Sequence, residues 1–186
     1  RKYPVKRLVH ISTDEVYGDR SELGSATEKS QFQPSNPYSA SKAAGDLIVQ
    51  SYIHTYQIPA IIFRPSNNFG PRQYPEKMIP LAISNMLLGE KFPLHGTGDY
   101  ARSWIFVEDF CRAVCLFLHE GKIGEAYNVG GTQKTNNEVI AIIAKMLGKN
   151  FEDSIEHVKN RAGQDKCYLL DWQKVRELHN FHHEHT

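Results

Sequence analysis

The sequence predicts an α/β protein built on a parallel sheet, and three observations support this fold class. The apolar run at residues 7–12 (RLVHIS) has the length of a buried strand, and so does the run at 60–63 (AIIF). Between them, residues 37–56 repeat apolar side chains at the spacing of a helix. A buried strand, a helix and a second buried strand indicate a βαβ unit, in which the two strands run parallel.

The helix of this unit has a clear start and one apolar face. Asn36 can cap its first turn, and Pro37 suits the first helical position. Apolar side chains then recur at four-residue spacing at Ala44, Ile48 and Tyr52. We therefore expect the helix to begin near residue 37 and to end near residue 56.

The remainder of the chain continues the alternation of strands and helices. We expect helices at residues 79–88, 109–118, 135–147 and 172–178, and strands at 92–95, 103–107, 126–129 and 168–170. Asp109 is expected to cap the helix that follows it. Residues 18–36 are polar and long for a loop, which indicates a functional lid.

The composition excludes several classes of protein. Of 186 residues, 40% are apolar or aromatic, and 22 basic against 21 acidic residues give a net charge of +1. This balance rules out intrinsic disorder and offers no basic excess for binding nucleic acid. The apolar runs are too short to span a membrane, and the start (RKYP) lacks the apolar region of a signal peptide. We therefore expect neither a nucleic-acid partner nor a membrane partner.

The three cysteines form no disulfide framework. We expect Cys111 and Cys115 to be small buried residues in a reducing compartment, and hence a cytoplasmic protein. Four of the nine histidines lie between residues 179 and 185, which we interpret as a frayed polar tail rather than a metal site.

Tyr38 and Lys42 form the first candidate catalytic pattern. They are four residues apart at the start of a helix, so they share one helix face. An ammonium group beside a phenol lowers the tyrosine pKa, which would make Tyr38 a usable general base. Such pairs also arise by chance on helix surfaces, so this pattern alone does not decide the function.

The second pattern follows the first buried strand, where residues 12–18 read STDEVYG. In open parallel sheets, ligands bind beyond the carboxyl ends of the strands. Asp14 and Glu15 could divide the roles of acid and base there, if their surroundings separate their pKa values. A solvated acidic loop is the alternative.

Together, the two patterns resemble the extended short-chain dehydrogenase/reductase family, and the triplet Thr13-Asp14-Glu15 is similar to that of its nucleotide-sugar 4,6-dehydratases. The resemblance extends over nearly all of residues 5–178. It is carried by further segments at 66–71 (SNNFGP), 74–80 (YPEKMIP), 96–109 (GTGDYARSWIFVED), 127–131 (YNVGG) and 160–165 (NRAGQD). The family usually has Pro and His where this chain has Ala162 and Gln164.

The resemblance implies that a nucleotide-activated hexose is dehydrated to a 4-keto-6-deoxy sugar nucleotide through transient reduction of NAD. Tyr38, beside Lys42, would take the proton of the C4 hydroxyl, to which Thr13 would hydrogen-bond. Glu15 would remove the C5 proton, and Asp14 would protonate the departing C6 hydroxyl.

The resemblance also implies the binding residues and a homodimer. Asn68, together with Tyr38 and Lys42, would contact NAD. The sugar nucleotide would be bound by Thr13, Asn67, Lys77, Met78, Pro93, Leu94, His95, Arg102, Asn136, Asn160 and Arg161. Direct counting favours Asn137 over Asn136, but the apolar pattern that follows favours Asn136, which we prefer.

The sequence departs from the family at its start, because no glycine-rich turn for the NAD pyrophosphate occurs in it. We therefore expect the C-terminal part of a larger enzyme that lacks the N-terminal, Gly-rich NAD-binding half. Residues 1–74 would form the latter part of a Rossmann-like, doubly wound parallel sheet with the catalytic residues. Residues 75–186 would form a smaller α/β substrate-binding subdomain, with about 126–147 packing back on the Rossmann part.

Three alternatives stay open beside dTDP-glucose as the first choice of substrate. A UDP-glucose 4,6-dehydratase would perform the same chemistry on another base. A sugar-nucleotide epimerase or decarboxylase would need Tyr38 and Lys42 but not Asp14 and Glu15, so the acidic pair discriminates. A catalytically inert fragment or a sugar-nucleotide binding module is the alternative of another class.

Overall fold

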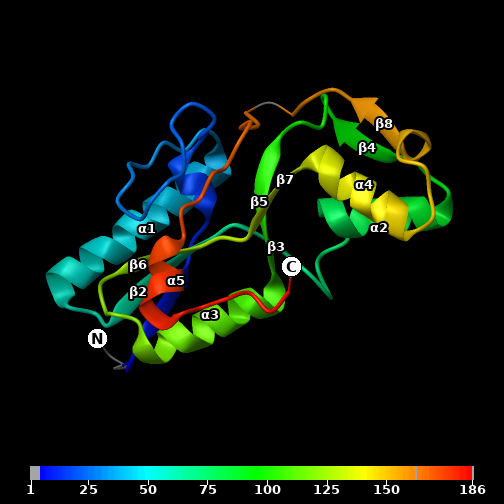
Figure 1. Ribbon diagram of the computed structural model, residues 1–186. Helices are drawn as coiled ribbons and strands as arrows, with labels where there is room; N and C mark the ends of the chain where they lie inside the picture. Colours follow the sequence, from blue (N-terminus) through cyan, green and yellow to red (C-terminus); the bar gives the residue numbers. More distant parts are fainter. Residues whose placement is uncertain (1–4, 162, 186) are drawn as a thin grey trace.

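The computed structural model describes residues 5–161 and 163–185, and Ala162 lies outside the described residues. Its elements form two lobes joined by a small sheet (Figure 1). The predicted α/β class is confirmed, because parallel strands alternate with helices along most of the chain. Among the described residues, no helix is long and apolar enough to cross a membrane.

The first lobe is a parallel sheet with helices on both faces. Strands β1 (Leu8–Ile11), β2 (Ala60–Pro65) and β6 (Ala126–Val129) pair in that order. Successive side chains of a strand point to opposite faces. Ile61 and Phe63 pack against α3 (Val107–Glu120) and α5 (Gln173–His179), whereas Arg64 contacts α1 (Pro37–Tyr56).

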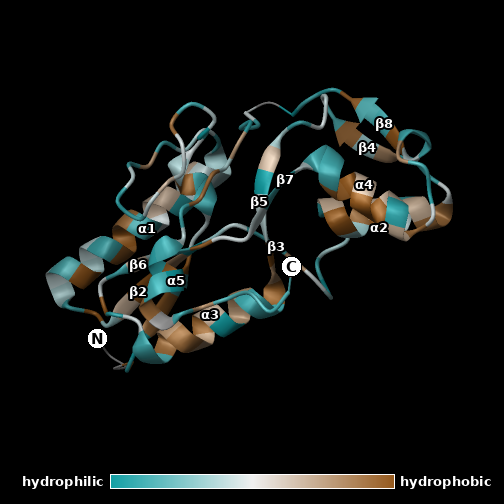
Figure 2. Ribbon diagram, viewed as in Figure 1, coloured by the Kyte–Doolittle hydropathy of each residue, from teal (hydrophilic) through white to brown (hydrophobic). Residues whose placement is uncertain are grey.

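The second lobe is smaller and has its own apolar core. Strands β4 (Phe92–His95) and β8 (Ile155–Val158) pair in parallel, and η2 (Glu152–Ser154) precedes β8. Helices α2 (Met78–Leu88) and α4 (Asn136–Met146) pack against each other and against this pair. Figure 2 shows hydrophobic residues on both α2 and α4. The small lobe is therefore stabilised by a core of its own, separate from that of the first lobe.

A three-stranded sheet connects the lobes. Strand β5 (Ala101–Phe106) lies between β3 (Asn67–Phe69), which is parallel to it, and β7 (Thr132–Thr135), which is antiparallel. We expected about residues 126–147 to pack back on the Rossmann part. Instead, β6 joins the first sheet while α4 belongs to the core of the small lobe.

Several local expectations are wrong for identifiable reasons. Helix α3 begins at Val107, so Asp109 lies inside its first turn rather than capping it. Cys111 and Cys115 are exposed, because Ala113 and Phe117 form the buried face of α3. The expected strand at 168–170 is reduced to one isolated bridge, which pairs Leu170 with Ala26.

The C-terminal tail is docked rather than frayed. Phe181 is buried in the first-lobe core, and the His183 ring stacks on Trp172 with centroids 4.6 Å apart. The backbone N–H groups of Glu184 and His185 donate to the buried Asp109 carboxylate at 2.9 and 3.1 Å. These contacts satisfy the carboxylate that the sequence suggested was a helix cap.

Candidate active site

The two candidate carboxylates lie directly after β1, in the 3-10 turn η1 (Asp14–Tyr17). Thr13 caps this turn by accepting from the Glu15 backbone N–H at 3.3 Å, and its hydroxyl donates to Asp14 Oδ1 at 3.3 Å. Asp14 is only 4% exposed, and its Oδ2 has no hydrogen-bond partner among the described residues. Burial, reinforced by the neighbouring Glu15, raises the pKa of Asp14 to about 7.

The Glu15 side chain is less buried than that of Asp14 and has more polar neighbours. Burial raises its pKa, as does the charge of Asp165, while hydrogen bonding from Asn36 and the charge of Arg102 act in the opposite direction. The two adjacent carboxyl groups therefore sit in different surroundings, which is the condition for dividing the work of acid and base.

Helix α1 carries Tyr38 and Lys42 past the same turn. Asn36 accepts from the Ser39 backbone N–H at 2.9 Å, and Ser39 bonds back to the Asn36 N–H at 3.1 Å, which fixes the start of the helix. Lys42 Nζ donates to the Ile11 carbonyl at 2.7 Å, which ties α1 to the end of β1. The Tyr38 side chain, 53% exposed, faces Thr13 and the two carboxylates.

The expected lowering of the Tyr38 pKa is wrong for this structure. Burial and the nearby Glu15 raise the Tyr38 pKa, and the hydrogen bond with Thr13 only partly opposes them. The Lys42 ammonium is engaged with a backbone carbonyl, while the two carboxylates disfavour a second negative charge beside them.

A cavity of about 590 Å³ is lined by residues of both lobes, Glu15 among them. This volume is in the range of small-molecule sites. Its wall contains most of the residues expected to bind substrate, namely Asn67, Lys77, Met78, Pro93, Leu94, His95, Arg102, Asn136 and Arg161. These residues come from six separate parts of the chain, so the fold assembles what the motifs only suggested.

Arg102 is the most deeply placed cation of the cavity, at 8% exposed. Its Nη1 donates to the carbonyls of Ala101 and Lys166 at 2.8 and 3.2 Å, and its Nη2 donates to that of Asp165 at 2.8 Å. The guanidinium also lies 4.5 Å from the centroid of the Tyr168 ring. In the described part of the chain, no carboxylate forms a salt bridge with it, so its charge is available to an anion in the cavity.

His95 and Arg161 form a polar pair in the wall of the same cavity. Arg161 Nε donates to His95 Nε2 at 3.2 Å, and His95 Nδ1 lies 3.0 Å from the Lys159 carbonyl. Since Nε2 accepts, Nδ1 must carry the proton that is donated to the carbonyl. His95 is therefore neutral in this arrangement, and it orients the Arg161 guanidinium along the cavity wall.

The three asparagines of uncertain role have distinct positions. Asn136 is 9% exposed and lines the cavity, whereas Asn137 donates to the Thr97 carbonyl and to Asp99 outside it. Asn160 donates to the Tyr100 hydroxyl at 2.6 Å and is not part of the cavity wall. The geometry thus favours Asn136 over Asn137 and leaves Asn160 a residue of the surrounding loops.

Four expected catalytic or cofactor residues lie beside the cavity rather than in its wall: Thr13, Asp14, Tyr38 and Lys42. Asn68 also lies outside the wall, with its Nδ2 donating to the Ser66 carbonyl at 3.1 Å. They mark a second region at the carboxyl ends of β1 and β2.

This second region fits one end of a dinucleotide. The buried side-chain oxygens of Ser12, Ser66 and Asn68 have no partner among the described residues. Buried polar atoms are normally hydrogen-bonded, so unpartnered ones at this edge are suited to a polar ligand. The residues present could contact the nicotinamide end of NAD. Among the described side chains, no cluster of histidine, cysteine and acidic residues could hold a metal ion.

Sequence reasoning missed several residues of the wall. Tyr168 is the most informative, because its hydroxyl donates to Asp165 at 2.8 Å while its ring covers Arg102. Gln164, Trp104 and Asn36 also line the cavity. Gln164 lies in the segment NRAGQD and Trp104 in GTGDYARSWIFVED, so both stand within recognised motifs, but no motif includes Tyr168.

Comparison with known proteins decides the family. The family model described as "NAD dependent epimerase/dehydratase family" matches residues 1–130. The chain belongs to this family. A dTDP-glucose 4,6-dehydratase of Haemophilus influenzae is 47% identical over 181 aligned positions, and the alignment covers 91% of this chain and 54% of that protein.

Solved structures of the family share the fold. A dTDP-glucose 4,6-dehydratase of Bacillus anthracis in complex with NAD is 45% identical, with a TM-score of 0.92 over 97% of this chain and 57% of that one. One from Streptomyces venezuelae with NAD and a TDP ligand is 42% identical, with a TM-score of 0.93 over 98% of this chain and 56% of that one. The chain thus spans about half the length of the relatives it matches.

Proposed function

We propose that this chain is the catalytic and sugar-nucleotide-binding part of a dTDP-glucose 4,6-dehydratase. The observation that carries the proposal is the pair Asp14 and Glu15, held in different surroundings next to Tyr38 and beside a cavity that contains Arg102. In the parent enzyme, as we call it, this chain is joined to an upstream dinucleotide-binding part. The activity, substrate and partners proposed here are those of the parent enzyme.

The two carboxyl groups support a division of roles. Asp14 is deeply buried with a pKa of about 7, so a large share of it is protonated at neutral pH and can give a proton to the departing C6 hydroxyl. Glu15 is less deeply buried, and although burial also raises its pKa, hydrogen bonding from Asn36 and the charge of Arg102 oppose that rise and favour its charged form. Glu15 therefore suits removal of the C5 proton.

The order of the steps follows from carbonyl chemistry. In the chain alone the Tyr38 pKa is raised, so its role as a base requires the positive charges of Lys42 and of bound NAD to lower it. Tyr38 then takes the proton of the C4 hydroxyl, to which Thr13 hydrogen-bonds, and C4 becomes a ketone as its hydride leaves. The proton on C5 is then beside a carbonyl and becomes acidic enough for Glu15 to remove. Asp14 protonates the C6 hydroxyl, which leaves as water. A proton returned to C5 completes the 4-keto-6-deoxy sugar.

NAD, when bound, supplies the acceptor that takes a hydride from C4 and returns it to C6. On this chain Tyr38, Lys42 and Asn68 would contact it. The unpartnered buried oxygens of Ser12 and Ser66 support this site. The diphosphate of the sugar nucleotide would extend past Arg102 and Arg161, whose guanidinium groups match phosphate oxygens.

The experiment is to incubate the parent enzyme with NAD and dTDP-glucose and to analyse the sugar nucleotide by mass spectrometry and NMR. The proposal expects a 4-keto-6-deoxy product that is lighter by one water. UDP-glucose in a parallel reaction tests the other base. A product of unchanged mass with inverted C4 would instead identify an epimerase, and no turnover of either substrate would favour a binding module.

The face of α1 that the sequence marked as apolar supports a homodimer. Leu47, Ile48 and Tyr52 are 56%, 59% and 50% exposed, which is unusual for a run of large apolar side chains on one helix. We propose that two copies of the parent enzyme pack through this face. Ile48→Lys should give monomers in analytical ultracentrifugation, whereas an unchanged dimer would place the interface elsewhere.

The cysteines of the chain are free thiols, which supports the cytoplasm as the location of the parent enzyme.

A further inference from the structure

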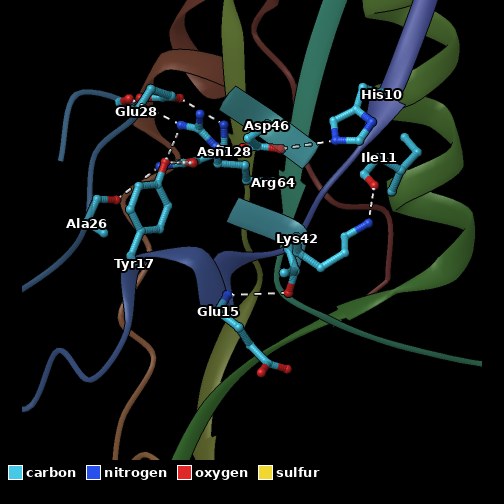
Figure 3. A network of polar contacts seen from close by, with 11 residues as sticks. His10, Ile11, Glu15, Tyr17, Ala26, Glu28, Lys42, Asp46, Arg64 and Asn128 are labelled. Atoms are coloured by element: carbon cyan, nitrogen blue, oxygen red, sulfur yellow. Dashed lines mark hydrogen bonds and ion pairs between the residues drawn. The ribbon is translucent and has the colours of Figure 1, made fainter. Parts of the chain in front are cut away.

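A buried ionic network lies behind the catalytic residues and was not anticipated from the sequence (Figure 3). Its centre is Arg64 of β2, which is 1% exposed. Arg64 Nε donates to Asp46 Oδ2 at 2.7 Å, and Arg64 Nη1 donates to the Tyr17 hydroxyl at 2.7 Å. Asp46 belongs to α1 and is fully buried, and Tyr17 is the last residue of η1.

The contacts of Tyr17 have one consistent direction. Its hydroxyl has a single hydrogen, which it donates to Asn128 Oδ1 at 2.8 Å, and it accepts from Arg64. Burial raises the pKa of Tyr17 to about 12, so the hydroxyl stays protonated and keeps this donor role. Asn128 in turn donates to the carbonyls of Ala26 and Asp171 at 3.0 and 2.9 Å. The network therefore reaches from the sheet into the loop at 18–36.

The network joins the two elements that carry the candidate catalytic groups. Turn η1 holds Asp14 and Glu15, and α1 holds Tyr38 and Lys42 about two turns and one turn before Asp46, respectively. Arg64 contacts the far end of η1 and the middle of α1 through one planar group. A guanidinium has fixed geometry, so it sets the distance between its two partners more strictly than a flexible contact would.

We infer that Arg64, with Tyr17 and Asp46, forms a clamp that positions the carboxylate turn η1 against the tyrosine helix α1 for the dehydration step. This inference rests on the proposed function for its catalytic consequence. Catalytic groups lose much of their effect when they are displaced by about 1 Å. The three clamp residues touch no substrate atom and act through the turn and the helix.

Tyr17→Phe tests the clamp with the least disturbance, because it removes one hydroxyl and keeps the ring packed against Phe32. Tyr127→Phe is the matched control. Tyr127 is also 1% exposed, and its hydroxyl accepts from the Lys122 backbone N–H at 2.8 Å, on the side of the sheet that packs against α3. Both variants lose one buried hydroxyl, but only the first loses a contact with η1.

Two readouts in the parent enzyme separate positioning from stability. The first is amide hydrogen exchange of residues 12–18, which should become faster in Tyr17→Phe and stay unchanged in Tyr127→Phe. The second compares two partial reactions with dTDP-glucose: formation of reduced nicotinamide, and entry of solvent deuterium at C5. In Tyr17→Phe the C5 exchange should fall by about ten- to a hundredfold, with a much smaller change in reduced nicotinamide.

The outcomes distinguish the inference from the proposed function. If Tyr17→Phe behaves like Tyr127→Phe in both readouts, the clamp is overturned while the dehydratase proposal stands. If the parent enzyme does not transform dTDP-glucose, the dehydratase proposal fails. The exchange at residues 12–18 then still decides whether the clamp holds η1.

Discussion

Two buried regions of this molecule contain the same pair of residue types, an aspartate and an arginine, and use them in opposite ways. In the clamp, Asp46 and Arg64 are 0% and 1% exposed and bond each other at 2.7 Å. At the candidate active site, Asp14 and Arg102 are 4% and 8% exposed, and no ion pair between them is formed. Burial is therefore almost equal, and the pairing of charges is what differs.

The difference distinguishes buried charges that stabilise the fold from buried charges that can interact with a substrate. A buried charge is tolerated when an opposite charge and hydrogen bonds compensate it, as Arg64, His10 and Asp46 compensate one another. Asp14 lacks such a partner and responds by a raised pKa, while Arg102 contacts only neutral carbonyls through its hydrogen bonds. Charged groups beside a cavity that have no partner of opposite charge in the protein can interact with a substrate instead.

The largest expected effect concerns Glu15, next to the uncompensated aspartate. In the parent enzyme Glu15→Gln should lower formation of the 4-keto-6-deoxy product by about 10²–10⁴-fold, because a general base is lost. Tyr38 still acts on C4, so reduced nicotinamide should accumulate, which its absorbance measures. Tyr38→Phe is the control, since it should stop the reaction before that signal appears. Product release near the parent rate would favour an epimerase-type site.

The clamp side of the comparison predicts a large loss of stability. Asp46→Asn keeps the shape of the side chain but leaves Arg64 buried without its counter-charge, which should cost about 3–5 kcal/mol in the free energy of unfolding. Urea unfolding followed by circular dichroism measures it. Asp153→Asn, at an exposed position in the small lobe, is a control that should change little. A loss under 1 kcal/mol would mean that the ion pair is not the support we describe.

Arg102 should behave as a binding residue rather than a structural one. Arg102→Ala in the parent enzyme should weaken dTDP binding by about ten- to a hundredfold, because a charge-assisted contact to phosphate is worth about 1.5–3 kcal/mol. Isothermal titration calorimetry with dTDP measures this affinity. Arg112→Ala, which removes a partly exposed arginine of α3 in an ion pair with Glu184, should leave the affinity unchanged. Equal affinities in both variants would remove Arg102 from the diphosphate site.

The smallest effect is a pH-dependent change in stability at Asp14. Its folded pKa is raised, so its protonated form stabilises the fold at low pH, and that contribution is lost as pH rises from about 4 through about 7. Asp14→Asn should therefore be more stable than the unmodified chain at pH 8 and similar to it near pH 4. Thermal unfolding across this pH range provides the test, and a constant difference would contradict it.

The fold was largely predictable because its main elements follow local rules. The runs at 7–12 and 60–63 and the capped helix from Pro37 each have a pattern that a few residues determine. Strands β3, β7 and β8 were not predicted, since each is three or four residues long and depends on a distant partner. Tertiary pairing overrides weak local preference in such short segments.

The residues of the candidate site also fall into those that local motifs identified and those that depend on distant partners. Motif segments identified most of the cavity wall, including Arg102 and Asn136, because each lies in a recognisable run of residues. The role of Tyr168 and the clamp around Arg64 could not be seen, because their partners lie far away in sequence: Tyr17 and Arg64 are 47 residues apart. The Tyr38 pKa was mispredicted because helix spacing located Lys42 but not the Ile11 carbonyl that engages it.

The most direct measurement is the titration of Asp14 itself. Aspartate carboxyl carbons labelled with ¹³C can be followed by NMR against pH in the chain, with Asp14→Asn assigning the signal. The account predicts a titration near pH 7, because Asp14 is buried beside Glu15 without a charged partner. A titration near the ordinary value of about 4 would show that Asp14 is ionised at neutral pH, and it would contradict the assignment of Asp14 as the acid.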